Sequence, residues 1–349
     1  MKNFFEDRYN SIEFEITLMN LISEISEYNG KLTAYRELNP NIFNNLEKNI
    51  PLHYINSFIS THKDIQISNI RLKELVLHRM VPKTIAEDSI SCYYKTHYLV
   101  HNKYDSLSVD TKTIQELHFQ LLNYCGSDST KWRYESQSIQ GIQKNIMYNS
   151  KHHPFPHELI PQSMEHLCNQ YNTINHKKTF HPLSLIARYM LNYYCIFPFS
   201  QGNHKAALIL LQLLLLKNGY TFIKYVCLDK YIEMKEFEYH DCLYKSSANW
   251  YCNEHNLSFW LRTFLDIILE AYKDLHNTVL ESKCNYTKTE QIQNFIKKHK
   301  KTFTKNSIRI AYPDISESTI NKTLSTLQLR GQVQLVSKGR SARWTYIQT

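Results

Sequence analysis

The chain has 349 residues, of which 42% are hydrophobic and 21% are charged, an ordinary balance for a folded protein. Its longest apolar run lies within residues 206–216, well short of the about 20 residues that span a bilayer, and the acidic start of the chain lacks a secretory core, so we expect a cytoplasmic protein without membrane contact. The formal net charge of +9 lies entirely in residues 281–349, which hold 13 Lys and Arg against 4 Asp and Glu, whereas the first 280 residues hold 28 of each kind.

Few turn-forming residues are present, since only 7 glycines and 9 prolines occur, and this favours helices over short strands. The spacing of apolar residues predicts helices over 11–75, with breaks at Asn39-Pro40 and Ile50-Pro51, and then over 109–124, from Pro161, and over 182–194, 206–218, 229–244 and 257–275. The stretch 138–156 is predicted to be β-rich or irregular. The eight cysteines form no CxxC pairs, which indicates reduced thiols.

The basic C-terminal segment has a pattern of its own. Helices are predicted over 287–300, 304–311 and 316–329, the last with Ser316 as its N-cap, and strands over 333–336 and 342–347. Three helices followed by two strands look like a winged helix-turn-helix. Its basic charge points to a polyanion partner, nucleic acid first.

This interpretation predicts which residues contact DNA. The start of the third helix would enter the major groove, and the basic tip between the strands would contact phosphates. An alternative stays open, because such modules also mediate homodimers or dock on a neighbouring domain. The predicted DNA-binding residues are Ser318, Thr319, Asn321, Lys322, Lys338, Arg340 and Arg343.

A short loop, Phe197-Pro198-Phe199-Ser200-Gln201-Gly202-Asn203-His204-Lys205, opens the apolar helix. Gly202 lets the backbone approach a ligand closely, and we expect Asn203 to cap the helix. The free N–H groups of a helix N-terminus form an anion site. Lys205 in the first turn opposes the helix dipole, which a bound anion would offset. From these residues alone, a plain cap with a solvent-facing lysine is the favoured explanation.

The layout of this loop resembles the signature of the Fic family, His-x-Phe-x-(Asp/Glu)-Gly-Asn-Gly-Arg-x-x-Arg, whose members transfer AMP or a related phosphoryl group to protein hydroxyls. Lys131-Trp132-Arg133 and the segment 138–156 resemble the region of the flap, the hairpin that docks a target peptide. The resemblance implies a mainly α Fic/Fido helical fold with a β-hairpin flap, plus the C-terminal winged helix-turn-helix. The expected domains are an N-terminal helical region (1–90), the Fic/Fido core (91–280) and the winged-helix domain (281–349).

The resemblance also assigns roles within the loop, and the departures fall on the catalytic positions. Phe197 takes the place of the histidine base, and Gln201 that of the acidic Mg²⁺ ligand. Lys205 and Leu208 replace two arginines, and His204 replaces a glycine. The phosphate- or nucleotide-binding residues implied are Ser200, Gly202, Asn203, His204, Lys205 and Tyr239, with ATP and Mg²⁺ as the cofactor that the family would bring.

These departures lead to two hypotheses. The leading one is a Fic relative with an inactive loop that acts as a nucleotide- or DNA-binding regulator, because Phe197 has no lone pair and loss of a general base costs about 10²–10⁴ in rate. The alternative is an active protein adenylyltransferase with a relocated base, either His204 or one of His152 and His153 in the flap, where a protein target would dock. The inhibitory helix of many Fic proteins finds its closest match at residues 62–67, which lack the glutamate.

One further pattern concerns zinc. His240, Cys242, Cys252 and His255 offer four ligand types, but their spacing fits no standard site, so no metal site is predicted.

Overall fold

The computed structural model describes residues 4–5, 12–61, 67–76, 80–125, 131–135, 155–283, 287–298, 302–337, 339 and 342–347. The contacts within the chain divide it into two compact units, residues 1–275 and 276–349. The finer division of the first unit at residue 90 stays a prediction.

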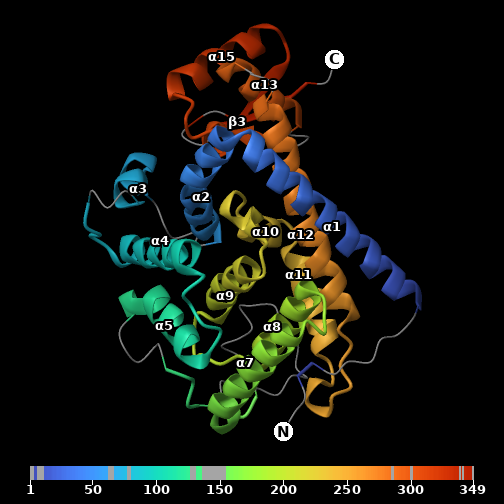
Figure 1. The fold of residues 1–349 in the computed structure, drawn as a ribbon. Helices are drawn as coiled ribbons and strands as arrows, with labels where there is room; N and C mark the ends of the chain where they lie inside the picture. Colours follow the sequence, from blue (N-terminus) through green and yellow to red (C-terminus); the bar gives the residue numbers. More distant parts are fainter. Residues whose placement is uncertain are drawn as a thin grey trace. The chain divides into compact units, whose positions relative to one another are not determined.

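The first unit is built from helices (Figure 1), in agreement with the mainly α fold that was predicted. Its α-helices are α1 (Ile12–Leu38), α2 (Pro40–Thr61), α3 (Asn69–Val76), α4 (Ile85–Lys103), α5 (Thr111–Leu122), α7 (Ile160–Lys177), α8 (Pro182–Ile196), α9 (Asn203–Lys217), α10 (Leu228–Met234), α11 (Glu236–Ser247) and α12 (Ser258–Lys283), the last of which begins in this unit. Short 3₁₀ helices cover η1 (Asn123–Cys125), η3 (His157–Leu159), η4 (Thr221–Lys224) and η5 (Trp250–Cys252).

Two of the expected helix boundaries differ from the structure. Pro40 begins α2, as the predicted break at Asn39-Pro40 requires, but Pro51 lies inside α2 and does not end it. The single helix expected over 229–244 is divided at Lys235, between α10 and α11. A proline inside a helix removes one backbone hydrogen bond, which the packing of the neighbouring helices must offset.

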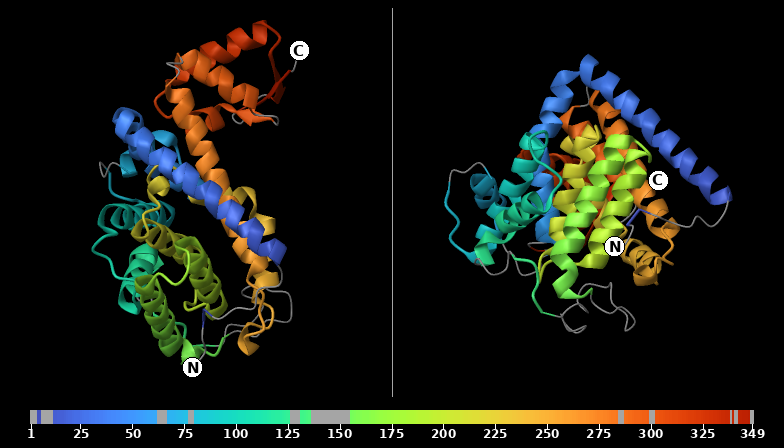
Figure 2. Two further views of the ribbon diagram at one scale, coloured as in Figure 1. Left: turned by 45° about the vertical axis from the view of Figure 1, so that its right-hand side comes forward. Right: turned by 60° about the horizontal axis from the view of Figure 1, so that its bottom comes forward.

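Helices α8 and α9 form the centre of this unit. Every residue of α9 from Ala206 to Leu216 is buried, so this helix has no polar face. Helix α7 packs on α8, and α4 and α5 pack on α9 (Figure 2). Gln212 is the polar residue within the buried stretch of α9, and it is hydrogen-bonded to histidines of α4. The predicted apolar core helix is confirmed.

Local capping explains where two of the surrounding helices begin. The Thr84 side chain accepts a hydrogen bond from the Glu87 backbone N–H (3.1 Å) at the start of α4. The Asp110 carboxylate accepts one from the Thr113 N–H (2.7 Å) at the start of α5. Such caps satisfy N–H groups that have no partner within the helix. Among the described helices, none combines the length and the apolar character needed to cross a membrane.

The second unit contains α13 (Lys288–Lys298), β1 (Phe303–Thr304), α14 (Lys305–Ala311), α15 (Glu317–Leu329), β2 (Val333–Ser337) and β3 (Arg343–Tyr346). The strands form an antiparallel sheet in the order β1-β3-β2, with Trp344 opposite both Phe303 and Leu335. The three helices and two strands lie where they were predicted, and Ser316 caps α15. Strand β1 was not predicted. Ile292, Ile308, Ile320, Leu324 and Trp344 belong to one buried core.

Candidate functional site

The candidate site is the loop between α8 and α9. Phe197 ends α8 in a left-handed conformation (φ 50°, ψ 67°), and its N–H donates to the Tyr193 carbonyl at 2.9 Å. A left-handed conformation costs a residue with a side chain about 1–2 kcal/mol, so contacts with the surroundings must maintain it. The Phe197 side chain is half-buried, whereas Ser200 and Gln201 are exposed.

Arg133 holds the first half of the loop. Its Nε atom donates to the Phe197 carbonyl at 2.8 Å, and its Nη2 atom donates to the carbonyl of Phe155. The backbone N–H of Arg133 donates to the Pro198 carbonyl at 2.9 Å, and the neighbouring Trp132 forms an antiparallel bridge with Phe199. The Arg133 side chain is buried, so its guanidinium satisfies carbonyl groups that water does not reach.

His118 of α5 holds the second half of the loop. Its ring stacks on Phe199, with the centroids 3.5 Å apart and the planes at 2°. Its Nε2 atom donates to the Gln201 carbonyl at 2.9 Å. Burial lowers the pKa of His118 to about 4, which keeps the ring neutral at neutral pH. The interaction therefore fixes the backbone of Gln201 while its side chain stays exposed.

Asn203 closes the loop on itself. Its Nδ2 atom donates to the Phe199 carbonyl at 2.6 Å, and its Oδ1 atom accepts from the Phe199 N–H at 3.0 Å. The N-cap of α9 is Gly202, without a side-chain cap, so the expectation that Asn203 caps the helix is wrong. The amide side chain carries both a donor and an acceptor, and Phe199 presents the matching pair. The first-turn N–H groups of α9 therefore lack a side-chain partner from the cap position.

Gly202 is required where it stands. Its φ of +74° lies in the left-handed region, and a Cβ atom there would lie 2.8 Å from Cδ1 of Leu122 and 3.4 Å from Nε2 of His118. Both conditions favour glycine, since other residues would meet strain and overlap at once. The backbone here thus approaches α5 closely.

His204 and Tyr239, two of the predicted binding residues, are brought together through Tyr194. The His204 Nδ1 atom lies 3.2 Å from the Tyr194 hydroxyl, which lies 3.0 Å from the hydroxyl of buried Tyr239. Burial lowers the pKa of His204 to about 4, and the nearby His240 adds to the effect. His204 is therefore neutral at neutral pH, and the linking Tyr194 was not found by sequence reasoning.

Lys205 is directed toward α2. Its Nζ atom lies 4.0 Å from the ring centroid of Phe58, a cation–π distance. Leu208, one turn further, is buried. The resemblance aligns Lys205 and Leu208 with the two arginines of the signature. Lys205 places its ammonium over an aromatic ring, and Leu208 is a core residue.

A buried carboxyl group lies on α10. Asp229 is hydrogen-bonded by the hydroxyl of Tyr93, and its Oδ1 atom has no partner among the described residues. Burial raises the pKa of Asp229 to about 7. On the same helix, Glu233 accepts from Ser57 and from Ser60, the latter at 2.9 Å. No motif in the sequence indicates these pairs, because each joins residues more than 130 positions apart.

Several predicted residues lie outside the described residues. They are His152 and His153, the flap from 138 to 154, the inhibitory-helix match at 62–66, and Lys338 and Arg340 of the second unit. Their predicted roles stay predictions.

The remaining predicted DNA-binding residues lie on α15 and β3. Ser318, Lys322 and Arg343 are exposed, and Thr319 and Asn321 are half-buried. The Ser316 hydroxyl lies 2.9 Å from the Ser318 hydroxyl and 2.8 Å from that of Thr319. The first two turns of α15 thus present the Ser318 hydroxyl and Lys322 to the solvent.

The histidines and cysteines weighed as zinc ligands are not grouped. Cys242 is buried and donates its S–H to the Tyr239 carbonyl at 3.1 Å, and Cys252 is exposed. Within the described ranges, no cluster of three or more His, Cys, Asp or Glu residues is arranged to hold a metal ion.

Comparison with known proteins gives the family of the domain. Residues 108–215 match the model of the Fic/DOC family. Among curated proteins, none matches the chain. Among solved structures, the chain is similar to a Fic family protein from Desulfovibrio desulfuricans G20, with 14% identity, a TM-score of 0.60 and 99% of both chains covered. It is also similar to a Fic domain containing signaling protein from Bacteroides thetaiotaomicron VPI-5482, with 13% identity and a TM-score of 0.57, covering 74% of this chain and 97% of that one. A third similar structure is Fic-1 from C. elegans, with 15% identity and a TM-score of 0.51, covering 78% of this chain and 74% of that one.

Proposed function

Because residues 108–215 form a Fic domain on a Fic-type fold, we propose that this chain is a Fic protein that no longer transfers AMP and acts as a DNA-binding regulator. The observation that carries the proposal is Phe197 at the base position of the signature. Its ring has no lone pair and cannot take a proton from an attacking hydroxyl.

The histidines closest to the loop are poor replacements for the base. His118 is buried, and its Nε2 atom already donates to the Gln201 carbonyl. His204 is hydrogen-bonded to Tyr194, and its pKa of about 4 lies far below neutral pH. A general base works best with a pKa near the working pH, so a base this weak gives little driving force for proton transfer.

The loop also fits a Mg²⁺-bound nucleotide poorly. Mg²⁺ prefers carboxylate oxygens together with phosphates, and Gln201 offers a neutral amide oxygen. Lys205 is placed over Phe58 and has none of the bidentate geometry of arginine. The first-turn N–H groups of α9, next to Gly202, still offer a phosphate hydrogen-bond donors. They supply neither a general base nor a metal ligand for transfer.

A transfer assay tests the proposed loss of AMP transfer. The purified full chain is incubated with ATP labelled on its α-phosphate, with Mg²⁺ and cell extract, and modified hydroxyls are sought by mass spectrometry. We expect no label from the natural chain, and label from a variant that combines Phe197→His with Gln201→Glu. Labelling by the natural chain that is lost in His204→Gln would overturn the proposal in favour of a relocated base.

The proposal of DNA binding is supported by the positive charge of residues 281–349 and by the exposed start of α15. The whole net charge of +9 lies within residues 281–349. Each phosphate contact releases counterions, so binding to duplex DNA should weaken steeply as salt is raised. Lys322→Ala and Arg343→Ala should each weaken binding and reduce the salt slope by about one, as expected for one phosphate contact.

A matched control distinguishes a specific surface from general charge. Lys297 is also exposed in the same unit, but it lies beside Leu327 and Arg330, at the opposite end of α15. Lys297→Ala should leave the affinity for DNA unchanged within about twofold. Fluorescence anisotropy with random duplexes provides the measurement. Affinity that is absent or indifferent to salt would contradict the DNA-binding proposal and leave the inactive loop unaffected.

A further inference from the structure

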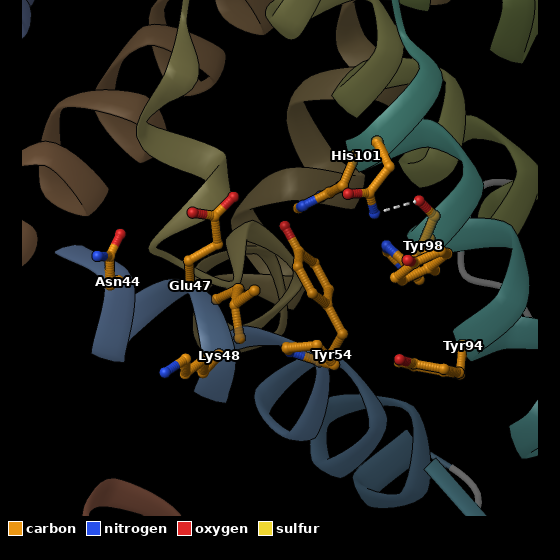
Figure 3. Close-up of a pocket in the computed structure, with 11 residues that line it drawn as sticks. Asn44, Glu47, Lys48, Tyr54, Tyr94, Tyr98 and His101 are labelled. Carbon is orange, nitrogen blue, oxygen red and sulfur yellow. Dashed lines mark hydrogen bonds between the residues drawn. The ribbon is translucent and has the colours of Figure 1, made fainter. Parts of the chain in front are cut away.

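A cavity of about 420 Å³ lies between α2 and α4, away from the signature loop (Figure 3). Its buried floor is formed by Ile50, Tyr54 and His97, and its mouth is bordered by exposed Glu47 and Tyr98. The floor connects to α9 at Gln212, nine residues after Asn203, which is about 13 Å along a helix. Its size is within the range of pockets that hold small molecules.

Five of the eleven residues that line the cavity carry aromatic rings. Tyr54 stacks on His97 with centroids 4.2 Å apart, and Tyr94 and Tyr98 lie on one face of α4 with centroids 6.1 Å apart. The Tyr54 hydroxyl is anchored on the carbonyls of η4 and the turn after it, at 3.3–3.4 Å. Flat rings held in fixed positions favour a flat aromatic ligand that can stack between them.

Two histidines that line the cavity, His97 and His101, share one acceptor on Gln212, and burial keeps their rings neutral. His97 Nδ1 and His101 Nε2 lie 2.8 Å and 3.1 Å from the same Oε1 atom of Gln212, so both rings donate to it. Burial lowers the pKa of His101 to about 4, and it also lowers that of His97. The buried part of the cavity therefore carries no charge at neutral pH.

His101 offers an acceptor to a ligand at the half-buried side of the cavity. Within the described residues, His101 makes no hydrogen bond other than the one to Gln212. Since its Nε2 atom carries the proton, its Nδ1 atom has a free lone pair. His101 lines the cavity and is half-buried, so a molecule inside can reach this ring.

The mouth gives no strong preference for either sign of charge. Glu47 and Lys48 both border it and are both exposed. In Figure 3 the Glu47 side chain extends on the same side of α2 as the Tyr54 ring, and Lys48 points away from the other side chains. A single exposed carboxylate is screened by water and adds little to binding.

We propose that this cavity binds a small, uncharged, planar aromatic molecule that stacks on the tyrosine rings and donates an N–H to Nδ1 of His101. The proposal does not depend on the loss of AMP transfer or on DNA binding. It predicts a preference by shape and by one hydrogen bond, with little contribution from charge.

The test uses indole with the full-length chain, by ligand-observed NMR titration. Indole is planar, uncharged and carries one N–H donor, and 1-methylindole is its matched control without the donor. We expect saturable binding of indole and binding of 1-methylindole weaker by about fivefold to tenfold, the usual effect of one hydrogen bond. Tryptamine and indole-3-acetate, a cation and an anion of the same ring, should bind no more tightly than indole.

Variants locate the site. Tyr98→Ala removes a 57% exposed ring at the mouth and should weaken indole about threefold to tenfold. Phe237→Ala, which removes a 78% exposed ring on α11, is its control and should leave indole binding unchanged. His101→Phe keeps an aromatic ring and should remove the preference for indole over 1-methylindole. Tyr98→Ala and Phe237→Ala change exposed residues and should fold, so the test stays valid even if His101→Phe does not fold.

Three results would overturn the proposal. One is the absence of saturable indole binding at millimolar concentration. Another is equal affinity of indole and 1-methylindole for the natural chain. The third is tighter binding of either charged analogue, in particular tryptamine binding that Glu47→Gln abolishes, which would assign the cavity to an organic cation.

Discussion

Replacing Gly202 by alanine tests the close approach between the loop and α5. The left-handed backbone (φ +74°) costs alanine about 1–2 kcal/mol. The new Cβ atom would lie 2.8 Å from Cδ1 of buried Leu122, and overpacking of this kind costs about 1–3 kcal/mol more. The sum is about 2–5 kcal/mol, which lowers the melting temperature by about 4–10 °C for a unit of this size.

Gly219 is the matched control, at the other end of the same helix. Its φ is +83°, but nothing lies within 4 Å of a Cβ atom there, so Gly219→Ala should show the backbone cost alone, about 1–2 kcal/mol. Thermal unfolding followed by circular dichroism measures both variants. In a Leu122→Ala background the excess cost of Gly202→Ala should disappear. Equal destabilisation by the two glycine variants would refute the predicted overlap with Leu122.

Three further predictions concern the loop and the buried histidines. Asn203→Ala should lower the free energy of unfolding by about 1–3 kcal/mol in urea unfolding, because both polar groups of Phe199 lose their partner. Asn203→Asp should cost at least as much, because it buries a charge and places a carboxylate oxygen against the Phe199 carbonyl. Arg133→Met should cost about 3 kcal/mol in the same assay, whereas Arg262→Met, at an exposed position, should cost little. Stability should also fall as pH is lowered from about 6.5 to 4. Burial lowers the folded pKa of four histidines to about 4 and also lowers those of His97, His181 and His240, so the unfolded chain binds more protons in this window. The raised pKa values of Asp229, Glu233 and Asp266 act in the opposite direction on a smaller number of groups. His204→Gln should reduce the loss of stability in unfolding titrations at several pH values.

Local sequence patterns predicted the parts of this fold that local forces decide. The continuous apolar run after Gly202 predicted α9, and the capping serine at Ser316 predicted the start of α15. Strand β1 was missed because two residues carry no readable alternation. Pro51 was expected to break a helix and does not, because tertiary packing can override a local cost of about 3 kcal/mol.

The contacts that fix the candidate site could not be predicted in the same way. His118 reaches Gln201 across 83 positions, and Arg133 reaches Phe197 across 64. The resemblance placed Arg133 only in the region of the flap, and no pattern marked His118. Their partners are backbone carbonyls, which every residue possesses. The role of Asn203 was mistaken for a related reason, since an amide can serve a cap or a loop and only the position of Phe199 decides.

These contacts also show that hydrogen bonds to the backbone shape the loop. Arg133, His118 and Asn203 bind the carbonyls of Phe197, Gln201 and Phe199 and do not depend on the side chains at 197 and 201. A substitution at either position therefore leaves the hydrogen bonds that shape the loop in place. Positions 197 and 201 are the two that the resemblance aligns with the base and the metal ligand of the signature. The fold thus constrains the backbone of this loop through hydrogen bonds in which the side chains of Phe197 and Gln201 take no part.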